Sequence, residues 1–113
     1  MAQHSRFTIV TDASFQTEVI AHPEPVLVVF EADWSGACHI AGPAIEALAS
    51  EFGDRIKMCR LNVDTHPRVA REYGIQGLPT FLFFQWGRVV DHLVGTVPKA
   101  ELTPRFESLL SAS

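Results

Sequence analysis

A cysteine at the start of a predicted helix is the residue of this chain best suited to chemistry. Cys38 ends the segment Trp34-Ser35-Gly36-Ala37-Cys38, which lies between a continuous apolar run and the periodic apolar residues of a helix. A thiol on a first helical turn lies near unpaired backbone N–H groups and the positive end of the helix dipole. Both favour the thiolate, which is the form that performs thiol–disulfide exchange.

The sequence around Cys38 predicts alternating strands and helices. Runs rich in β-branched and aromatic residues are typical of strands, whereas apolar residues three or four apart mark helices. Strands are predicted at 6–10, 26–30, 56–63, 80–85 and 89–94. Helices are predicted after Thr11-Asp12, from Ser35 to Gly53, at 67–73 and at 99–110. This order predicts an α/β fold, with a mixed sheet covered on both faces by helices, in a single domain spanning residues 1–113.

Local signals predict where the longest helix begins, bends and ends. Ser35 is a good N-cap, Pro43 should bend the helix, and Gly53 should stop it. The buried face of this helix should carry Ile40, Ile45, Leu48 and Phe52. Earlier in the chain, Thr11-Asp12 offers a cap for the first helix. Near the end, Gly87 should supply the positive φ that the tight connection 86–88 needs.

Several motifs, in order and in register, resemble the thioredoxin family nearly from end to end. They are Thr11-Asp12-Ala13-Ser14-Phe15, the 34–38 segment, Leu61-Asn62-Val63-Asp64, the 73–80 segment and Val94-Gly95. The resemblance implies the thioredoxin fold, a central five-stranded mixed sheet flanked by helices on both faces. It also implies that Pro79 is a cis-proline facing the active-site turn, and that the backbone of Leu78 pairs with an extended substrate peptide. The implied peptide groove is formed by Trp34, Gly36, Ala37, Gly77, Leu78, Pro79 and Gly95.

The motif departs from the family pattern at the position that matters most for catalysis. The family carries Trp-Cys-Gly-Pro-Cys, and here Ser35 replaces the exposed cysteine that attacks the substrate disulfide. A serine hydroxyl is a far weaker acid than a thiol and forms no disulfide, so the two-thiol cycle cannot close within this motif. Cys38 keeps the resolving position, which is expected to lie deeper, where desolvation opposes the thiolate. Serine also has a structural use, because an N-cap contributes about 1 kcal/mol over alanine.

A second departure lies on the central strand. Five residues before Trp34 the family usually has a buried aspartate that exchanges a proton with the resolving cysteine, and here Val29 stands there. Losing both groups indicates a protein no longer built around dithiol exchange. Glu31 lies on the same strand face as Val29, because side chains alternate along a strand. Its carboxylate either approaches Cys38 and serves as a base, or reaches solvent at the end of the strand.

The remaining cysteine and the histidines predict no further site. Cys59 lies in the third strand and is expected to be a small buried core residue, away from the active-site turn. His39 follows Cys38, but adjacent helix residues point about 100° apart, so His39 should face solvent. The histidines, which show no ligand spacing with the cysteines, are at positions 4, 22, 39, 66 and 92. The sequence therefore predicts no metal site and no cofactor.

Composition excludes other classes of function. Nine basic against thirteen acidic side chains give a net charge of −4, which disfavours binding to nucleic acid or an anionic membrane. No apolar run approaches the roughly 20 residues of a membrane span, and the first residues lack the apolar segment of a secretory signal. Two cysteines form no disulfide framework, which favours the reducing cytoplasm.

These observations lead to one predicted function with two alternatives. The chain is predicted to act on protein thiols and disulfides in cell redox homeostasis, with dithiol reductase activity absent or strongly impaired. Only monothiol chemistry through Cys38 would remain, with glutathione or another thiol reductant completing the exchange. One alternative is a non-catalytic chaperone or assembly factor that holds extended peptides against Trp34, Leu78 and Val94. The other is a subunit whose active partner is a different chain.

Overall fold

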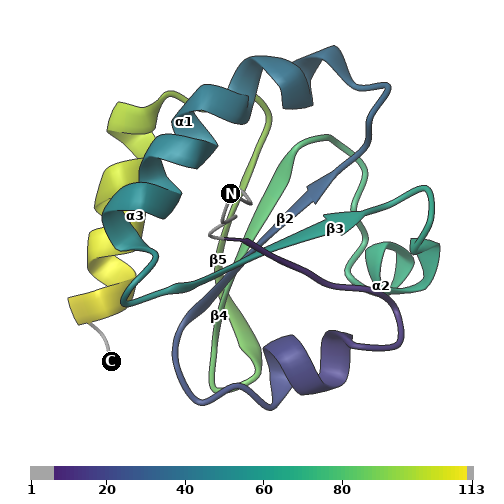
Figure 1. Cartoon of the computed structure of the whole chain (residues 1–113), viewed down its shortest axis with the longest axis horizontal. Coiled ribbons are helices and arrows are strands. Elements are labelled where there is room, and N and C mark those ends of the chain that lie inside the picture. The colour runs from purple at the N-terminus through teal and green to yellow at the C-terminus, as the bar shows by residue number, and fades with distance from the viewer. Residues whose placement is uncertain (1–6, 112–113) are drawn as a thin grey trace, which may run out of the picture.

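Five strands form one mixed sheet, which brings three strand ends to the same edge. The structure is a computed structural model that describes residues 7–111 (Figure 1). The strands, in the spatial order β1-β3-β2-β4-β5, are β1 (Phe7–Ile9), β2 (Val26–Glu31), β3 (Lys57–Asn62), β4 (Thr80–Gln85) and β5 (Arg88–Val94). β2 pairs in parallel with β3 and antiparallel with β4. The ends of β2 and β3 therefore lie beside the start of β4.

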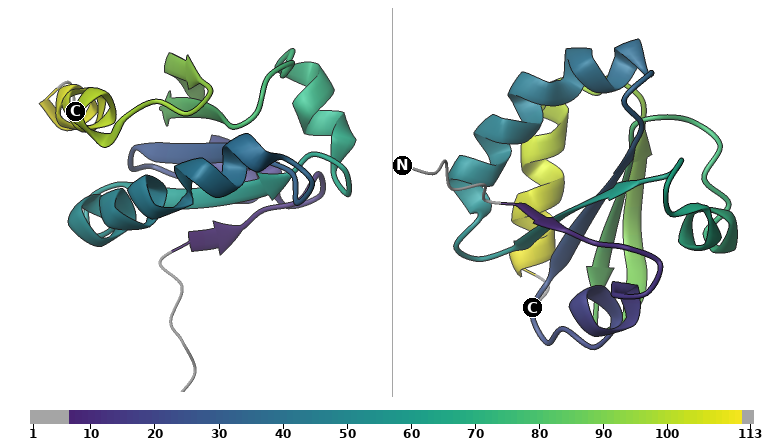
Figure 2. Two further views of the ribbon diagram at one scale, coloured as in Figure 1. Left: turned by 90° about the horizontal axis from the view of Figure 1, so that it is seen from above. Right: turned by 45° about the vertical axis from the view of Figure 1, so that its right-hand side comes forward.

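Helices cover both faces of this sheet, as predicted. They are the short π-helical segment η1 (Gln16–Ile20), α1 (Gly36–Phe52), α2 (Pro67–Glu72) and α3 (Lys99–Ser111). Figures 1 and 2 show α1 and α3 together on one side of the sheet, with η1 and α2 on the other. No helix within residues 7–111 is long and apolar enough to cross a membrane.

Each face of the sheet has its own hydrophobic core, because β2, β3 and β4 alternate their side chains between the two faces. The core under α1 and α3 includes Leu27, Val29, Met58, Phe81, Phe83 and Phe106. The core under η1 and α2 includes Val28, Phe30, Cys59, Leu61, Phe84 and Val69. All five residues of β2 from 26 to 30 are buried, which explains the continuous apolar run in the sequence.

The longest helix begins where the sequence predicts, and its details differ in two ways. Ser35 is the N-cap, and its Oγ accepts a hydrogen bond from the Cys38 N–H at 3.2 Å. Ile40 is 72% exposed and does not belong to the buried face, so that prediction is wrong. Gly53 follows the last helical residue but keeps a right-handed φ of −63°, not the left-handed conformation of a glycine cap. Pro43 lies inside the helix, and Figure 1 shows that its axis bends.

The predicted strands and turns hold, with small changes at their ends. β1 and β3 are shorter than predicted, although Val10 N–H still donates to Arg60 O and Val63 N–H to Glu31 O. Arg6, part of the predicted first strand, lies outside the described residues. The β4–β5 connection needs only Trp86 and Gly87, which both have positive φ (55° and 76°). This two-residue turn is tighter than the predicted connection. The β4–β5 register shifts between Phe83 and Phe84.

Asp12 caps a different helix from the one predicted. Its carboxylate oxygens accept the N–H groups of Arg68 and Val69, each at 3.0 Å, at the start of α2. In its own segment, Thr11 Oγ1 instead accepts the Ser14 N–H at 3.0 Å. The sequence could not show which helix Asp12 caps, because α2 lies more than fifty residues further along the chain. Asp12 therefore ties the first loop to α2.

We predict that Asp12→Ala lowers the free energy of unfolding by about 1 kcal/mol at pH 7, because α2 loses its cap. Desolvation raises the pKa of the Asp12 carboxyl, but hydrogen bonds from Val69 and Arg68 and nearby positive charge outweigh it and leave this pKa below its ordinary value. The stabilisation is thus present above the unfolded-state pKa and is lost as pH falls through the folded-state pKa. Urea unfolding at graded pH measures both effects.

Asp12→Asn is the matched control, since asparagine caps helices without the charge and should lose less stability than alanine at pH 7. Unfolding of Asp12→Ala at the wild-type urea concentration would contradict the assignment.

Candidate functional site

Three segments meet at one edge of the sheet and carry residues of the candidate site. Trp34 and Ser35 follow β2, Val63 follows β3, and Leu78 comes just before β4. Because β2 and β3 are parallel and β4 runs the other way, these segments emerge side by side. The topology therefore brings together side chains that lie far apart in the sequence.

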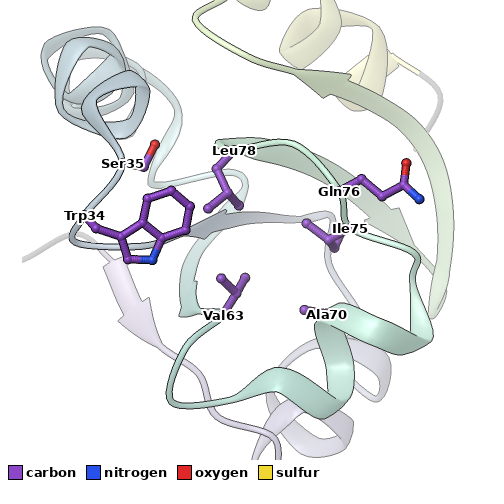
Figure 3. Close-up of a pocket in the computed structure, with 7 residues that line it drawn as sticks. All are labelled: Trp34, Ser35, Val63, Ala70, Ile75, Gln76 and Leu78. Carbon is purple, nitrogen blue, oxygen red and sulfur yellow. The ribbon is translucent and has the colours of Figure 1, made fainter.

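An apolar pocket of about 290 Å³ opens at this edge. Its lining residues are Trp34, Ser35, Val63, Ala70, Ile75, Gln76 and Leu78. Figure 3 shows the side chains of Trp34, Val63 and Leu78 around one space, with the Gln76 amide pointing away from it. We call these seven residues the groove. Trp34 and Leu78 were predicted for it, and Ser35 was predicted as the position of the missing attacking cysteine.

Four groove residues were missed from the sequence: Val63, Ala70, Ile75 and Gln76. Val63 could have been found, because the carboxyl ends of neighbouring parallel strands share an edge. Ile75 and Gln76 belong to the segment that precedes Leu78. Ala70 contributes from α2, and nothing in its sequence context indicates that this helix reaches the groove.

Trp34 is held in place although most of its surface is open to solvent. The side chain is 70% exposed, and its Nε1–H donates to Asp64 Oδ2 at 2.7 Å. The hydrogen bond fixes the indole at the wall of the groove, where its apolar ring is available to a partner. An anchored and exposed tryptophan beside an apolar pocket is typical of a binding surface.

The segment before β4 forms the other wall. The Leu78–Pro79 peptide bond is cis, and Pro79 O accepts the Gly95 N–H at 2.8 Å. Gly95 has a φ of +95°, a backbone conformation that favours glycine. Gly77 lies so close to Val94 that a Cβ atom on it would come within 2.7 Å of Val94 Cγ1. Pro79 and Gly95 thus lie together next to Leu78.

Not every predicted groove residue lines the groove. Gly77 and Val94 line a neighbouring pocket of about 520 Å³, together with His92. Gly36 and Ala37 lie on the first turn of α1, and neither is among the groove's lining residues. The structure does not bring these two positions to the pocket.

Ser35 is buried more deeply than Cys38, which is the reverse of what the resemblance implies. Ser35 is 6% exposed, whereas Cys38 is only partly buried, so the expectation that Cys38 lies deeper is wrong. The cap explains the difference, since Ser35 Oγ turns inward to accept the Cys38 N–H. Ser35 lies in the groove wall, and Cys38 opens elsewhere.

Cys38 lines a second, polar pocket of about 240 Å³. The other lining residues are Glu31, Ala32, Asp33, His39, Gly42 and Arg60. His39 is exposed, as predicted, and its Nε2 lies 2.7 Å from the carbonyl oxygen of Asp33, to which it donates. We call this the thiol pocket. It shares no lining residue with the groove.

Glu31 is half-buried in the thiol pocket, with 28% of its side chain exposed. Burial raises the pKa of its carboxyl, the negative charges of Asp33 and Glu46 raise it further, and the positive charge of Arg60 opposes them without cancelling them. Arg60 Nε lies 3.6 Å from Glu31 Oε2, an ion-pair distance too long for a hydrogen bond. Glu31 thus reaches solvent and also lines a pocket with Cys38, and its role as a base stays a prediction.

Arg60 is fixed by several contacts at once. Its Nη2 donates to Glu46 Oε2 at 3.1 Å, and its guanidinium lies 4.1 Å from the centre of the Phe7 ring. In the β2–β3 register, Arg60 is the partner of the fully buried Val29. Arg60 therefore places a positive charge beside the position where the resemblance implies an aspartate.

Cys59 is a buried core residue, as predicted, and it lies on the opposite face of the sheet from the thiol pocket. It is fully buried, and burial raises the pKa of its thiol to about 11. Both cysteines are free thiols. Among the described residues no group of His, Cys, Asp and Glu could hold a metal ion, and His4 lies outside them.

Comparison with known proteins agrees with the observed fold. The profile of the thioredoxin family matches residues 6–108. The chain belongs to the thioredoxin family. Its five-stranded mixed sheet with helices on both faces is the thioredoxin fold. Members of this family carry out redox chemistry on proteins, so proteins are the general class of partner.

The alignments with similar proteins span most of this chain and most of each similar protein. The chain is 43% identical over 102 residues to a thioredoxin of Porphyra purpurea, across 90% of this chain and 95% of the relative. It is 41% identical over 101 residues to thioredoxin 1 of Nostoc sp., across 89% and 94% of the two chains. It is 40% identical over 101 residues to a thioredoxin of Acidithiobacillus ferridurans, across the same shares.

We predict that the native protein exposes one reactive thiol at pH 8. Cys38 should react with a thiol reagent such as dithionitrobenzoate, because it lines an open pocket. Cys59 should stay unreactive until the chain unfolds, since it is fully buried and its thiol pKa is about 11. Counting thiols before and after adding guanidinium, with Cys38→Ala as the control, measures this. Two fast thiols in the folded state would contradict the placement of Cys59.

Proposed function

We propose that this thioredoxin-family protein acts on thiols and disulfides of other proteins through Cys38 alone, without a dithiol cycle. One observation carries the proposal: the groove is intact, and Ser35, not a cysteine, lies in its wall. A hydroxyl there attacks no disulfide at neutral pH, because its acidity is far below that of a thiol. Cys38 is then the one thiol of the motif, open to solvent through its own pocket.

Extended segments of substrate proteins are the ligands we propose for the groove. Trp34 and Leu78 supply apolar contact, and the backbone of Leu78 lies at an open loop where an extended chain can pair with it. Gly36, Ala37, Gly77, Pro79 and Gly95 belong to the same proposal as peptide contacts outside the groove, since none of the five lines it. Glutathione or another small thiol would complete the exchange.

We place this activity in the cytoplasm, in cell redox homeostasis. Both cysteines are free thiols, and a protein that acts through a single thiol needs a compartment that keeps it reduced. The proposal takes residues 1–113 as one domain, a choice supported by the family match over 6–108.

A non-catalytic peptide-binding role, as a chaperone or assembly factor, is the second candidate. Its specific support is the separation of the two pockets, since a peptide seated in the groove lies against Ser35 while Cys38 opens into the thiol pocket. In this role the groove binds and Cys38 takes no part.

Insulin reduction driven by dithiothreitol tests whether the dithiol cycle is absent. We predict that the wild type stays close to the uncatalysed rate and that Ser35→Cys accelerates reduction by at least about tenfold, because two thiols then stand in the motif. Ser35→Ala is the matched control and should stay inactive. Fast turnover by the wild type would contradict the proposal.

Trapping a mixed disulfide separates the two candidate roles. We predict that oxidised glutathione or a disulfide-bonded peptide forms a reductant-sensitive adduct with the wild type at Cys38, and none with Cys38→Ala, as read by mass spectrometry. The same Cys38→Ala variant should still bind a cysteine-free extended peptide, followed by Trp34 fluorescence in a Trp86→Phe background. Peptide binding without any adduct in the wild type would favour the non-catalytic role.

A further inference from the structure

Charged side chains from three elements meet around Cys38 in the thiol pocket. Glu31 comes from the end of β2, Arg60 from β3, and His39 from the first turn of α1 beside Cys38 itself. The pocket, of about 240 Å³, is polar and large enough for several water molecules. Within residues 7–111, Arg60 Nε is buried and makes no hydrogen bond, so a polar donor is left unpaired next to Glu31.

We propose that Glu31, positioned by Arg60, accepts the proton of the Cys38 thiol when Cys38 attacks a disulfide. The inference rests on the proposed function, and it assigns a catalytic group to that function. Glu31 and Cys38 line the same water-sized polar pocket, and the proposed proton transfer takes place within it. Val29, at the position where the resemblance implies an acid, is fully buried and apolar, and it can play no such part.

Other groups of the thiol pocket are less suited to this role. His39 uses Nε2 to donate to the Asp33 carbonyl oxygen at 2.7 Å, which leaves only Nδ1 of this exposed side chain as an acceptor. Asp33 is exposed at the rim of the pocket. Glu31 is the more buried carboxylate, and its ion pair with Arg60 restricts where its oxygens lie.

The charges that face Glu31 suit a proton acceptor. Desolvation raises the pKa of its carboxyl, and Arg60 on β3 lowers it. Asp33 after β2 and Glu46 on α1 raise it, and His39 on α1 lowers it, with a net rise. A carboxylate whose pKa is raised toward that of a thiol is a better base near neutral pH than an ordinary one. Arg60 favours the ionised carboxylate, and burial makes that carboxylate more basic.

The step conserves atoms and electrons. The S–H bond of Cys38 breaks and its proton goes to the Glu31 carboxylate, while the sulfur electron pair forms a bond to one sulfur of the substrate disulfide. The substrate S–S bond breaks, and its electron pair stays on the other sulfur. That sulfur leaves as a thiolate, which takes up a proton from Glu31 or from water. A small thiol of the glutathione class then attacks the mixed disulfide and restores Cys38 as a thiol.

Alkylation of Cys38 by iodoacetamide at graded pH tests the inference on the full chain. Mass spectrometry reports Cys38 separately, and Cys59 serves as an internal unreactive thiol. The wild-type rate should show an inflection in the acid range, where Glu31 is protonated, in addition to that of the thiol. Glu31→Gln should lose the acid inflection and react at least about tenfold more slowly at pH 7. Glu31→Asp should keep part of the rate.

Glu46→Gln is the matched control. It removes a carboxylate that also pairs with Arg60 but does not line the pocket, so the acid inflection should persist, moved to slightly lower pH because Glu46 raises the pKa of Glu31. An unchanged profile in Glu31→Gln overturns the inference. Faster alkylation in that variant overturns it as well, because Glu31 would then act only as a negative charge that disfavours the thiolate. If the wild type itself resists alkylation at every pH, the proposed function fails, whereas a reactive Cys38 that is indifferent to Glu31 leaves that function standing.

Discussion

The hydrogen bond between Ser35 Oγ and the Cys38 N–H determines how the rest of the site is arranged. It starts α1 directly after β2 and turns the Ser35 side chain inward, so that Ser35 is buried while Cys38 reaches a pocket. A cap of this kind stabilises a helix by about 1 kcal/mol, which is a real share of the small net stability of a domain of this size. Ser35 therefore stabilises the fold as the cap of α1.

Separation of the groove from the thiol pocket follows from that arrangement. Residues after β2 and β3 and before β4 build an apolar surface with Trp34 at its wall. On the α1 side of the sheet, the start of the same helix covers a set of charges that includes Glu31 and Arg60. The apolar groove and the polar thiol pocket thus lie on different sides of one short turn.

Most of the fold could be predicted from the sequence because local signals and the family motifs agree. The apolar run of β2, the Ser35 cap and the turn at Gly87 each point to the observed element. Predictions failed where tertiary contacts decide. Ile40 has helical spacing but faces solvent, and Asp12 caps α2 across the chain instead of the helix beside it. For the site, Trp34 and Leu78 could be predicted, but the relative depth of Ser35 and Cys38 depends on which way one hydroxyl turns.

The two edge strands of the sheet offer few aligned backbone groups for pairing with a strand of another molecule. One edge is β1, only three residues long, and the other is β5, whose pairing with β4 is interrupted by a register shift. Short and irregular edges resist extension by a neighbouring chain, because few unpaired backbone groups line up. The loop that carries Leu78 lies apart from both edges, at the start of an inner strand. At high concentration we therefore expect little edge-to-edge pairing between the sheets of neighbouring molecules. The loop that carries Leu78 stays open to a peptide.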